Sequence, residues 1–335
     1  MDVSLTVWLV TCAVIAGFFV FDFFAHVRTP HEPTLKESGF WSAFYVGLAL
    51  LFGLLVTFVW GSEYGGEYYA GFVTEKALSV DNLFVFLILM TTFAVPRVYQ
   101  QKVLLIGIAL ALVMRGGFIA VGAAAINAFS WVFYLFGIFL IYTAVKLIID
   151  HVRSRKPSEE KDEKAESFAI RMLKRVLPTT EEYHGDRLTV KIDGRRMVTP
   201  MLLTLVAIGT ADLMFALDSI PAIYGLTQEP YLVFTANAFA LMGLRQLYFL
   251  IGGLLERLVF LSYGLSIILG FIGVKLVLHA LHENTLPFLN DGEPLPVPEV
   301  GIGVSMTVIL SVLVVTIVAS LIASRPRATR KRTTR

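Results

Sequence analysis

Cysteine is nearly absent from this chain of 335 residues, because Cys12 is its single instance. One cysteine can form neither an internal disulfide framework nor a thiolate metal cage. Charge is scarce too: 16% of the residues are charged, whereas a soluble domain has about 25%. Hydrophobic residues make up 56% of the chain. This composition excludes an ordinary soluble domain and indicates a protein of the lipid bilayer.

Catalytic motifs are also missing from the longest polar stretch, at about 150–199. It has no phosphate-binding glycine loop, no paired histidines on a helix and no nucleophile elbow. We therefore expect neither an enzyme nor a bound cofactor. The stretch is interpreted as a cytoplasmic connector with a short helix, and alternating apolar residues around Asp193 and Gly194 predict a β-hairpin. A regulatory role for the connector is the alternative.

Long apolar runs are what the chain has in quantity. An α-helix needs about 20 mainly apolar residues to cross a bilayer. The runs that meet this criterion lie at about 5–25, 40–60, 70–94, 103–125, 130–149, 200–224, 231–254, 258–280 and 301–323. The fold prediction is an all-α polytopic membrane protein with about nine transmembrane helices. Five spans fill 1–149, four fill 200–323 after the connector, and a basic tail occupies 324–335.

The distribution of Lys and Arg predicts the orientation. Basic residues follow the first, third, fifth and seventh runs and fill the tail, while the alternate loops are acidic. By the positive-inside rule, we expect the N-terminus outside and the C-terminus in the cytoplasm. The basic tail is interpreted as an anchor on the lipid surface rather than a nucleic-acid site.

Three features recur in the same order in both halves of the chain: an acid pair six residues apart, an arginine and a lysine. They are Glu75 with Asp81, Arg115 and Lys146 in the first half, and Asp212 with Asp218, Arg245 and Lys275 in the second. Given the predicted orientation, the three-span units at about 70–149 and 200–280 run in opposite directions. The sequence therefore predicts an inverted repeat, an architecture of secondary transporters.

The four acids lie within apolar runs, where a charged side chain is energetically unfavourable. A charged residue at a helix centre costs about 2.5 to 3.5 kcal/mol on insertion scales, so four unpaired acids cost about 10 kcal/mol or more. One explanation is structural pairing with Arg115 and Arg245, but two arginines leave two carboxylates unneutralised. The lysines at 76, 146 and 275 lie near span ends and are expected to snorkel to the interface. A divalent cation would supply the missing charge.

Helix geometry suggests how such a site is arranged. Six residues rise about 9 Å and turn the second acid about 120° away from the first, so one straight helix cannot place both on one ion. Under the inverted repeat we expect two layers, in which Glu75 lies near Asp218 and Asp81 near Asp212, with both arginines flanking. Pro221 is expected to break the sixth helix, although a simple kink is an equal alternative. Further neutral oxygens would come from Asn82, Ser219 and Asn237.

The available ligands favour a hard cation. Carboxylate, amide, hydroxyl and carbonyl oxygens suit Mg²⁺, Ca²⁺ or Mn²⁺, whereas Zn²⁺ sites usually contain His or Cys. All six histidines lie in loops or at span ends, which disfavours zinc. Asp22 and His26 are interpreted as an interfacial polar pair, with a proton relay or cytoplasmic gate as the alternative.

The segments GFVTEKALSVDNLFVFLIL and TPMLLTLVAIGTADLMFALDSIPAIYGLT, with FAVPRVYQQKVLLIGIALALVMRGGFI between them, resemble the TerC family of integral membrane proteins, in particular its Alx-like subgroup. The resemblance covers about 5–323. It implies manganese efflux across the bacterial cytoplasmic membrane, an association with tellurite resistance, and Glu75, Asp81, Asp212 and Asp218 as the functional acids. The chain departs from the family pattern at Gly209, where many relatives have Glu.

The functional hypothesis is therefore a transporter that exports Mn²⁺ from the cytosol in exchange for protons, with the two halves rocking about the acids. Mn²⁺ is the substrate, not a cofactor. One alternative is a non-transporting membrane scaffold in envelope stress, tellurite resistance or protein insertion. Another is a Ca²⁺ exchanger of the same architecture. The oligomeric state does not follow from the sequence.

Overall fold

The structure is a computed structural model that describes residues 1–27, 32–129, 131–153, 178–180, 182–192, 195–251, 258–284, 286 and 289–324. Within these residues the chain is an all-α membrane protein with one small hairpin, which confirms the predicted fold class. Seven of the described helices are long and apolar enough to cross a membrane: α1, α2, α4, α5, α7, α10 and α11.

The first half of the chain consists of helices in simple succession. They are α1 (Leu5–Asp22), which continues as a π-helical turn (Phe23–Val27), α2 (Leu35–Trp60), α3 (Ser62–Thr92), α4 (Arg97–Ala128) and α5 (Val132–Arg153). The second half begins after a hairpin. Its elements are β1 (Thr189–Ile192), β2 (Arg195–Val198), α7 (Pro200–Tyr224), α8 (Pro230–Leu241), α9 (Leu244–Ile251), α10 (Leu261–His282), the 3₁₀ turn η4 (Asn290–Gly292) and α11 (Ile302–Ala323).

Two of the predicted spans differ from ordinary apolar helices. The 31 residues of α3 include Glu75, Lys76 and Asp81 within its apolar part. The other unusual span is divided into α8, with 12 residues, and α9, with 8 residues. With these two spans, the described helices account for every apolar run found in the sequence. Both unusual spans lie inside the bundle, where neighbouring helices rather than lipid surround their polar groups.

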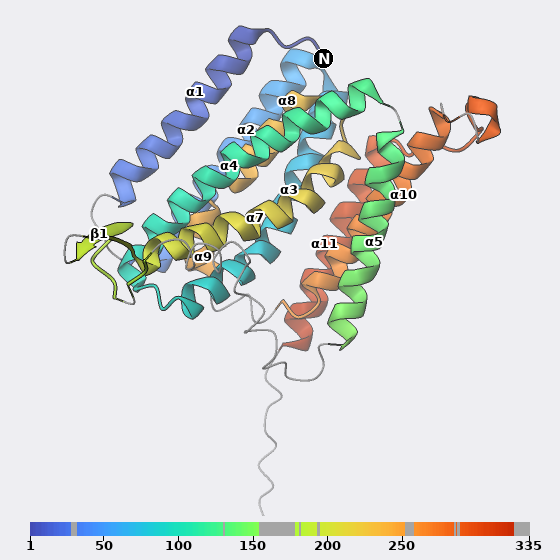
Figure 1. Ribbon diagram of the computed structural model, residues 1–335. Helices are drawn as coiled ribbons and strands as arrows, with labels where there is room; N and C mark the ends of the chain where they lie inside the picture. Colours follow the sequence, from blue (N-terminus) through green and yellow to red (C-terminus); the bar gives the residue numbers. More distant parts are fainter. Residues whose placement is uncertain are drawn as a thin grey trace, which may run out of the picture.

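The helices form one bundle with the hairpin at one end (Figure 1). We call this the hairpin end, where α1 and α3 finish and α4 and α7 begin, and the opposite end the far end. Equivalent helices of the two halves run in opposite directions and pack together, namely α3 with α7, α4 with α8 and α5 with α10. The α5–α10 contact is very close, because a Cβ on Gly137 would lie 2.8 Å from the Gly273 carbonyl oxygen. These directions are those that an inverted repeat requires, and the repeat symmetry itself stays a prediction.

The hairpin expected around Asp193 and Gly194 is present, with Thr189 opposite Val198 and Ile192 opposite Arg195. It is attached to the bundle by the Tyr183 hydroxyl, which donates to the Phe93 carbonyl at 2.7 Å, and by an ion pair between Lys102 and Asp186. The hydrogen bond from Lys102 lowers the pKa of Asp186. The helix expected elsewhere in the connector and the basic tail from 325 lie outside the described residues.

The expected break at Pro221 is wrong. Helix α7 continues through Pro221 and ends at Tyr224. The chain breaks instead between α8 and α9, where Met242 is extended and Gly243 has a φ of +78°. Glycine is required here for two reasons: an L-residue is strained at this φ, and a Cβ would lie only 2.9 Å from the Cβ of Tyr45.

Substituting Gly243 therefore tests the break. We expect Gly243→Ala to lower the free energy of unfolding by about 1 to 3 kcal/mol, the range for a residue held in a disfavoured backbone conformation. Thermal unfolding of the detergent-solubilised protein measures the change. The matched control is Gly303→Ala in α11, where nothing lies within 4 Å of the added Cβ and helix propensity favours alanine. Equal melting temperatures for the two variants would contradict a strained break.

Candidate functional site

A buried arginine lies between two of the predicted acids. Arg115, on α4, has no exposed surface, and it binds Asp212 of α7 through both carboxylate oxygens, with Nε at 3.0 Å from Oδ2 and Nη2 at 2.9 Å from Oδ1. Its Nη1 donates to Oε1 of Glu75 on α3 and lies 3.2 Å from the Ser219 hydroxyl oxygen. We call the three charged residues Glu75, Arg115 and Asp212 the central triad.

The central triad contradicts the predicted two-layer arrangement. Glu75 shares a guanidinium with Asp212, not with Asp218, and Arg115 enters the acid cluster instead of flanking it. The physical reason is depth. Both Glu75 and Asp212 lie near the middle of their helices, and equivalent residues close to the midplane of an inverted repeat come to the same level. The second acids, six residues on, then lie about 9 Å away toward opposite ends.

The two second acids are separate from the central triad. Asp218 is half-buried one and a half turns toward the far end, where its Oδ1 accepts a hydrogen bond from the Thr143 hydroxyl at 3.2 Å. Asp81 lies on α3 toward the hairpin end, and its side chain is outside the described part of the structure. The structure therefore brings two of the four predicted acids together and distributes the other two along the bundle.

The charges of the central triad do not balance. The three residues are buried, and they comprise two carboxyl groups but only one guanidinium, so ionisation of both acids would leave one net negative charge. Oε1 of Glu75 also accepts from the Ser79 hydroxyl at 3.4 Å, while Oε2 is buried with no hydrogen-bond partner among the described residues. A buried carboxylate oxygen without a partner is costly, because desolvation is not compensated.

The predicted neutral ligands have different positions. Ser219 contacts Arg115 and belongs to the central triad's surroundings. Asn82 is buried on α3. Asn237 is completely buried on α8, and neither atom of its amide has a hydrogen-bond partner in the described structure. At Gly209 an added Cβ would lie 3.2 Å from Cδ2 of Leu110, so α4 packs closely against this position.

Lys76 does not snorkel, contrary to the expectation. Its Nζ donates to the Ala240 carbonyl at 2.9 Å and approaches the Met242 carbonyl at 3.5 Å. These carbonyls belong to the last turn of α8, where the helix ends and its C=O groups lack intrahelical partners. The lysine therefore satisfies backbone oxygens inside the bundle that water cannot reach.

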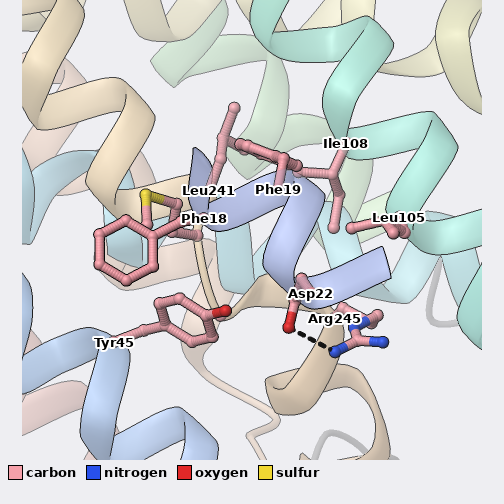
Figure 2. A pocket seen from close by; sticks show the side chains of 10 residues that line it. Phe18, Phe19, Asp22, Tyr45, Leu105, Ile108, Leu241 and Arg245 are labelled. Carbon is pink, nitrogen blue, oxygen red and sulfur yellow. Dashed lines mark hydrogen bonds and ion pairs between the residues drawn. The ribbon is translucent and has the colours of Figure 1, made fainter. Parts of the chain in front are cut away.

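The second arginine forms a separate buried centre near the hairpin end. Arg245 Nη2 lies 2.9 Å from Asp22 Oδ1, and its Nη1 donates to Gln101 at 2.9 Å. Gln246 also approaches the same Asp22 oxygen, at 3.4 Å. Figure 2 shows the Asp22–Arg245 pair, with Tyr45 and Leu105 beside it. Arg245 thus does not flank the four acids as expected, and Asp22 pairs with it, while the His26 side chain is outside the described residues.

The far end contains a hollow of about 430 Å³ between α3, α7, α10 and the start of α11. Four glutamates line it, namely Glu63, Glu67, Glu229 and Glu299, together with Lys275 and His279. Glu67 accepts from the Thr227 hydroxyl at 2.5 Å. No group of three His, Cys, Asp or Glu side chains with metal-binding geometry occurs among the described residues.

Sequence reasoning missed the helix break, the Lys76 contact and the Asp22–Arg245 pair. The break had a signal: Gly243 stands in the middle of an apolar run, two residues before an arginine, and an isolated glycine marks a weak point in a helix. The other two had none, because each joins residues more than 160 positions apart in the chain.

Comparison with known proteins agrees with the resemblance. Residues 60–328 match the family described as integral membrane protein TerC family. An uncharacterized membrane protein of Mycobacterium tuberculosis is 52% identical over 98% of this chain and 82% of its own length. A protein of Photorhabdus laumondii named "Putative membrane-bound redox modulator Alx" is 34% identical over 88% of each chain. The chloroplastic thylakoid membrane protein TERC of Arabidopsis thaliana is 41% identical over 74% of this chain and 62% of its own. No solved structure matches the chain.

Proposed function

This chain belongs to the TerC family of integral membrane proteins, and we propose that it exports Mn²⁺ from the cytosol in exchange for protons. The observation that carries the proposal is that two buried carboxyl groups share one guanidinium, and that Oε2 of the fully buried Glu75 has no hydrogen-bond partner among the described residues. Ionisable groups kept inside a membrane at such a cost most often belong to ion or proton pathways.

The proposed path has three successive cation-binding positions along the bundle instead of two layers of paired acids. A cation would pass from Asp81, toward the hairpin end, to Glu75 and Asp212, and then to Asp218 and the acidic hollow at the far end. The hairpin end is assigned to the cytoplasm and the far end to the outside, because basic residues gather at the hairpin end. Under this proposal the membrane is a bacterial inner membrane, with the N-terminus outside and the C-terminus in the cytoplasm.

Arg115 determines when a cation can enter. At about 4 Å, a guanidinium and a divalent ion repel by about 8 kcal/mol in a medium of effective dielectric 20. The arrangement in which Arg115 joins Glu75 to Asp212 is therefore the closed state, and the arginine acts as a tethered counter-ion. A cation or two protons on the acids would have to compensate the carboxylates when Arg115 leaves, which would couple metal and proton movement.

A second function is favoured by one specific contact. The bidentate Arg115–Asp212 interaction is the arrangement expected if the acids only hold helices together, as in a non-transporting scaffold for envelope stress, tellurite resistance or protein insertion. The same site could also move Ca²⁺, since its ligands are hard oxygens. No enzymatic reaction or cofactor is part of either proposal.

Metal flux tests the proposal. In inverted vesicles with purified protein, an outward-acting exporter should accumulate Mn²⁺, and an imposed pH gradient should accelerate the uptake. Parallel measurements with Ca²⁺, Mg²⁺ and Zn²⁺ identify the preferred ion, and empty vesicles provide the control. Uptake of Ca²⁺ in place of Mn²⁺ would identify the exchanger alternative, while absence of all metal flux would leave the scaffold.

A further inference from the structure

Two adjacent residues of α3 bind different parts of the bundle interior. Glu75 binds Arg115 in the central triad, and Lys76 binds the carbonyls at the end of α8. The chain then turns at Gly243, and Arg245 follows at the start of α9, where it contacts Asp22. A continuous series of contacts therefore leads from the central triad, through Lys76 and the helix break, to the Asp22–Arg245 pair.

The Lys76 contact is suited to fix the position of the break. An ammonium near a helix C-terminus is favourable, because the last carbonyls carry the negative end of the helix dipole. The extended Met242 and the left-handed Gly243 remove the helical hydrogen bonds that would otherwise hold α9 in line with α8. The position of Arg245, two residues beyond Gly243, thus depends on how the end of α8 is held.

The Asp22–Arg245 pair in turn holds α1 at the hairpin end. Along its 18 residues, α1 buries only Thr11, Ile15 and Asp22, and most of its surface faces outward from the bundle. Asp22 is the last α-helical residue before the π-helical turn, a distortion often found at functional positions. The space beside the pair, lined by Tyr45, Leu105 and others, measures about 10 Å³, which is room for about one water molecule.

We propose that the Asp22–Arg245 pair is a latch that closes the hairpin end of the bundle, and that Lys76 is the positioning residue that keeps the latch closed. Release of Lys76 from the α8 carbonyls lets the break move, separates Arg245 from Asp22, and opens the space beside α1 to water. A shift of α3 at Glu75 would release Lys76 because the residues are adjacent on one helix. The role of the latch as the cytoplasmic gate of a transporter rests on the proposed function; the latch itself does not.

Thiol accessibility tests the latch without any metal. Cys12 is the only cysteine, so Cys12→Ser supplies a cysteine-free background. Leu105→Cys then places a reporter in the space beside Asp22 and Arg245, where Leu105 is 5% exposed (Figure 2). The purified full-length protein is treated in detergent with a cationic, water-soluble thiol reagent. We expect slow labelling in the background, and labelling about tenfold faster or more in Lys76→Met and in Asp22→Asn, because each loses a charged hydrogen bond.

The double variant decides whether the two residues act through one latch. If they do, Lys76→Met combined with Asp22→Asn is labelled no faster than the faster single variant, whereas independent effects multiply. Lys275→Met, in the far-end hollow, should leave the rate unchanged. A second reporter, Ile208→Cys, is fully buried in α7 and reports general unfolding, so it should stay protected in every variant.

Slow labelling of the Leu105→Cys reporter in Lys76→Met, multiplicative rates in the double variant, or equal labelling of both reporters would overturn the proposal. If Lys76→Met does not accumulate, Lys76→Gln is measured instead. It retains a donor for one carbonyl, so an intermediate rate is expected and an unchanged rate overturns the proposal. If labelling follows the expected pattern but the protein moves no metal, the proposed function is rejected and the latch is retained. If the protein transports metal but labelling does not follow the pattern, the latch is rejected and the proposed function is retained.

Discussion

Arg115→Met is expected to lower the free energy of unfolding by about 3 to 5 kcal/mol, because it leaves two carboxylates buried without their counter-ion. Arg115 has no exposed surface and provides four donor contacts to Glu75, Asp212 and Ser219. The measurement is chemical or thermal unfolding of the solubilised protein, together with the yield of folded protein on size-exclusion chromatography.

Arg97→Met is the matched control on the same helix. Its guanidinium is 80% exposed and lies 3.9 Å from Glu32, so its removal should change stability by less than about 0.5 kcal/mol. If Arg115→Met were as stable as Arg97→Met, the central triad would not be an ion-paired structure in the membrane.

Neutralising the whole triad distinguishes the transporter from the scaffold. Replacing a complete buried ion network by hydrophobic residues of similar volume is often close to neutral for stability. The triple variant Glu75→Met, Arg115→Met, Asp212→Leu should therefore recover most of the lost stability. A scaffold recovers its function with its fold, whereas an exporter stays inactive because the charge that receives the cation is gone.

Asp218→Asn is expected to lower Mn²⁺ flux by about a hundredfold or more while the protein folds normally. An amide keeps the shape and one oxygen but removes the negative charge that a divalent cation needs. The one described hydrogen bond to the Asp218 carboxylate, from the Thr143 hydroxyl, can also be accepted by the amide oxygen. The stability change should therefore stay within about 1 kcal/mol. Flux in vesicles and the melting temperature are measured on the same preparation.

Asp186→Asn is the control for Asp218→Asn, because Asp186 lies in the hairpin region and pairs with Lys102 outside the proposed path. It should retain flux. If Asp218→Asn retains full Mn²⁺ flux, Asp218 is not a cation-binding position of the transport path. Aggregation of this variant without a specific loss of flux would support the scaffold. Asp81→Asn is predicted to behave like Asp218→Asn, since Asp81 lies on α3 at the position equivalent to Asp218 in the predicted repeat.

Several features could be predicted because they depend on properties summed along the chain. Composition and the length of apolar runs indicated an all-α polytopic membrane protein, and seven of the described helices are long and apolar enough to cross a membrane. The cost of a charge in lipid singled out Glu75 and Asp212, which do lie buried in the centre of the bundle. Turn chemistry at Asp193 and Gly194 predicted the hairpin that β1 and β2 form.

The partners of those charges could not be predicted in the same way. Arg115 meets Asp212 across 97 residues of sequence, and Arg245 meets Asp22 across 223. Which of two acids on a helix reaches a given arginine depends on how far each helix is rotated about its axis, and side-chain packing over the whole contact decides that rotation. The predicted pairing of Glu75 with Asp218 failed because Glu75 and Asp212 lie at the same depth, near the middle of their helices, and Arg115 on a third helix reaches both.

The sequence by itself determined that the protein lies in a lipid bilayer, that it is all-α, where the hairpin forms and which residues are too costly to face lipid, because each follows from local composition and spacing. Only the tertiary structure decided that Arg115 bridges Glu75 and Asp212, that the chain breaks at Gly243 and continues through Pro221, and that Lys76 binds the end of α8. These outcomes depend on contacts between distant helices. A proline or a lysine has several locally acceptable environments, and the packed neighbours select among them.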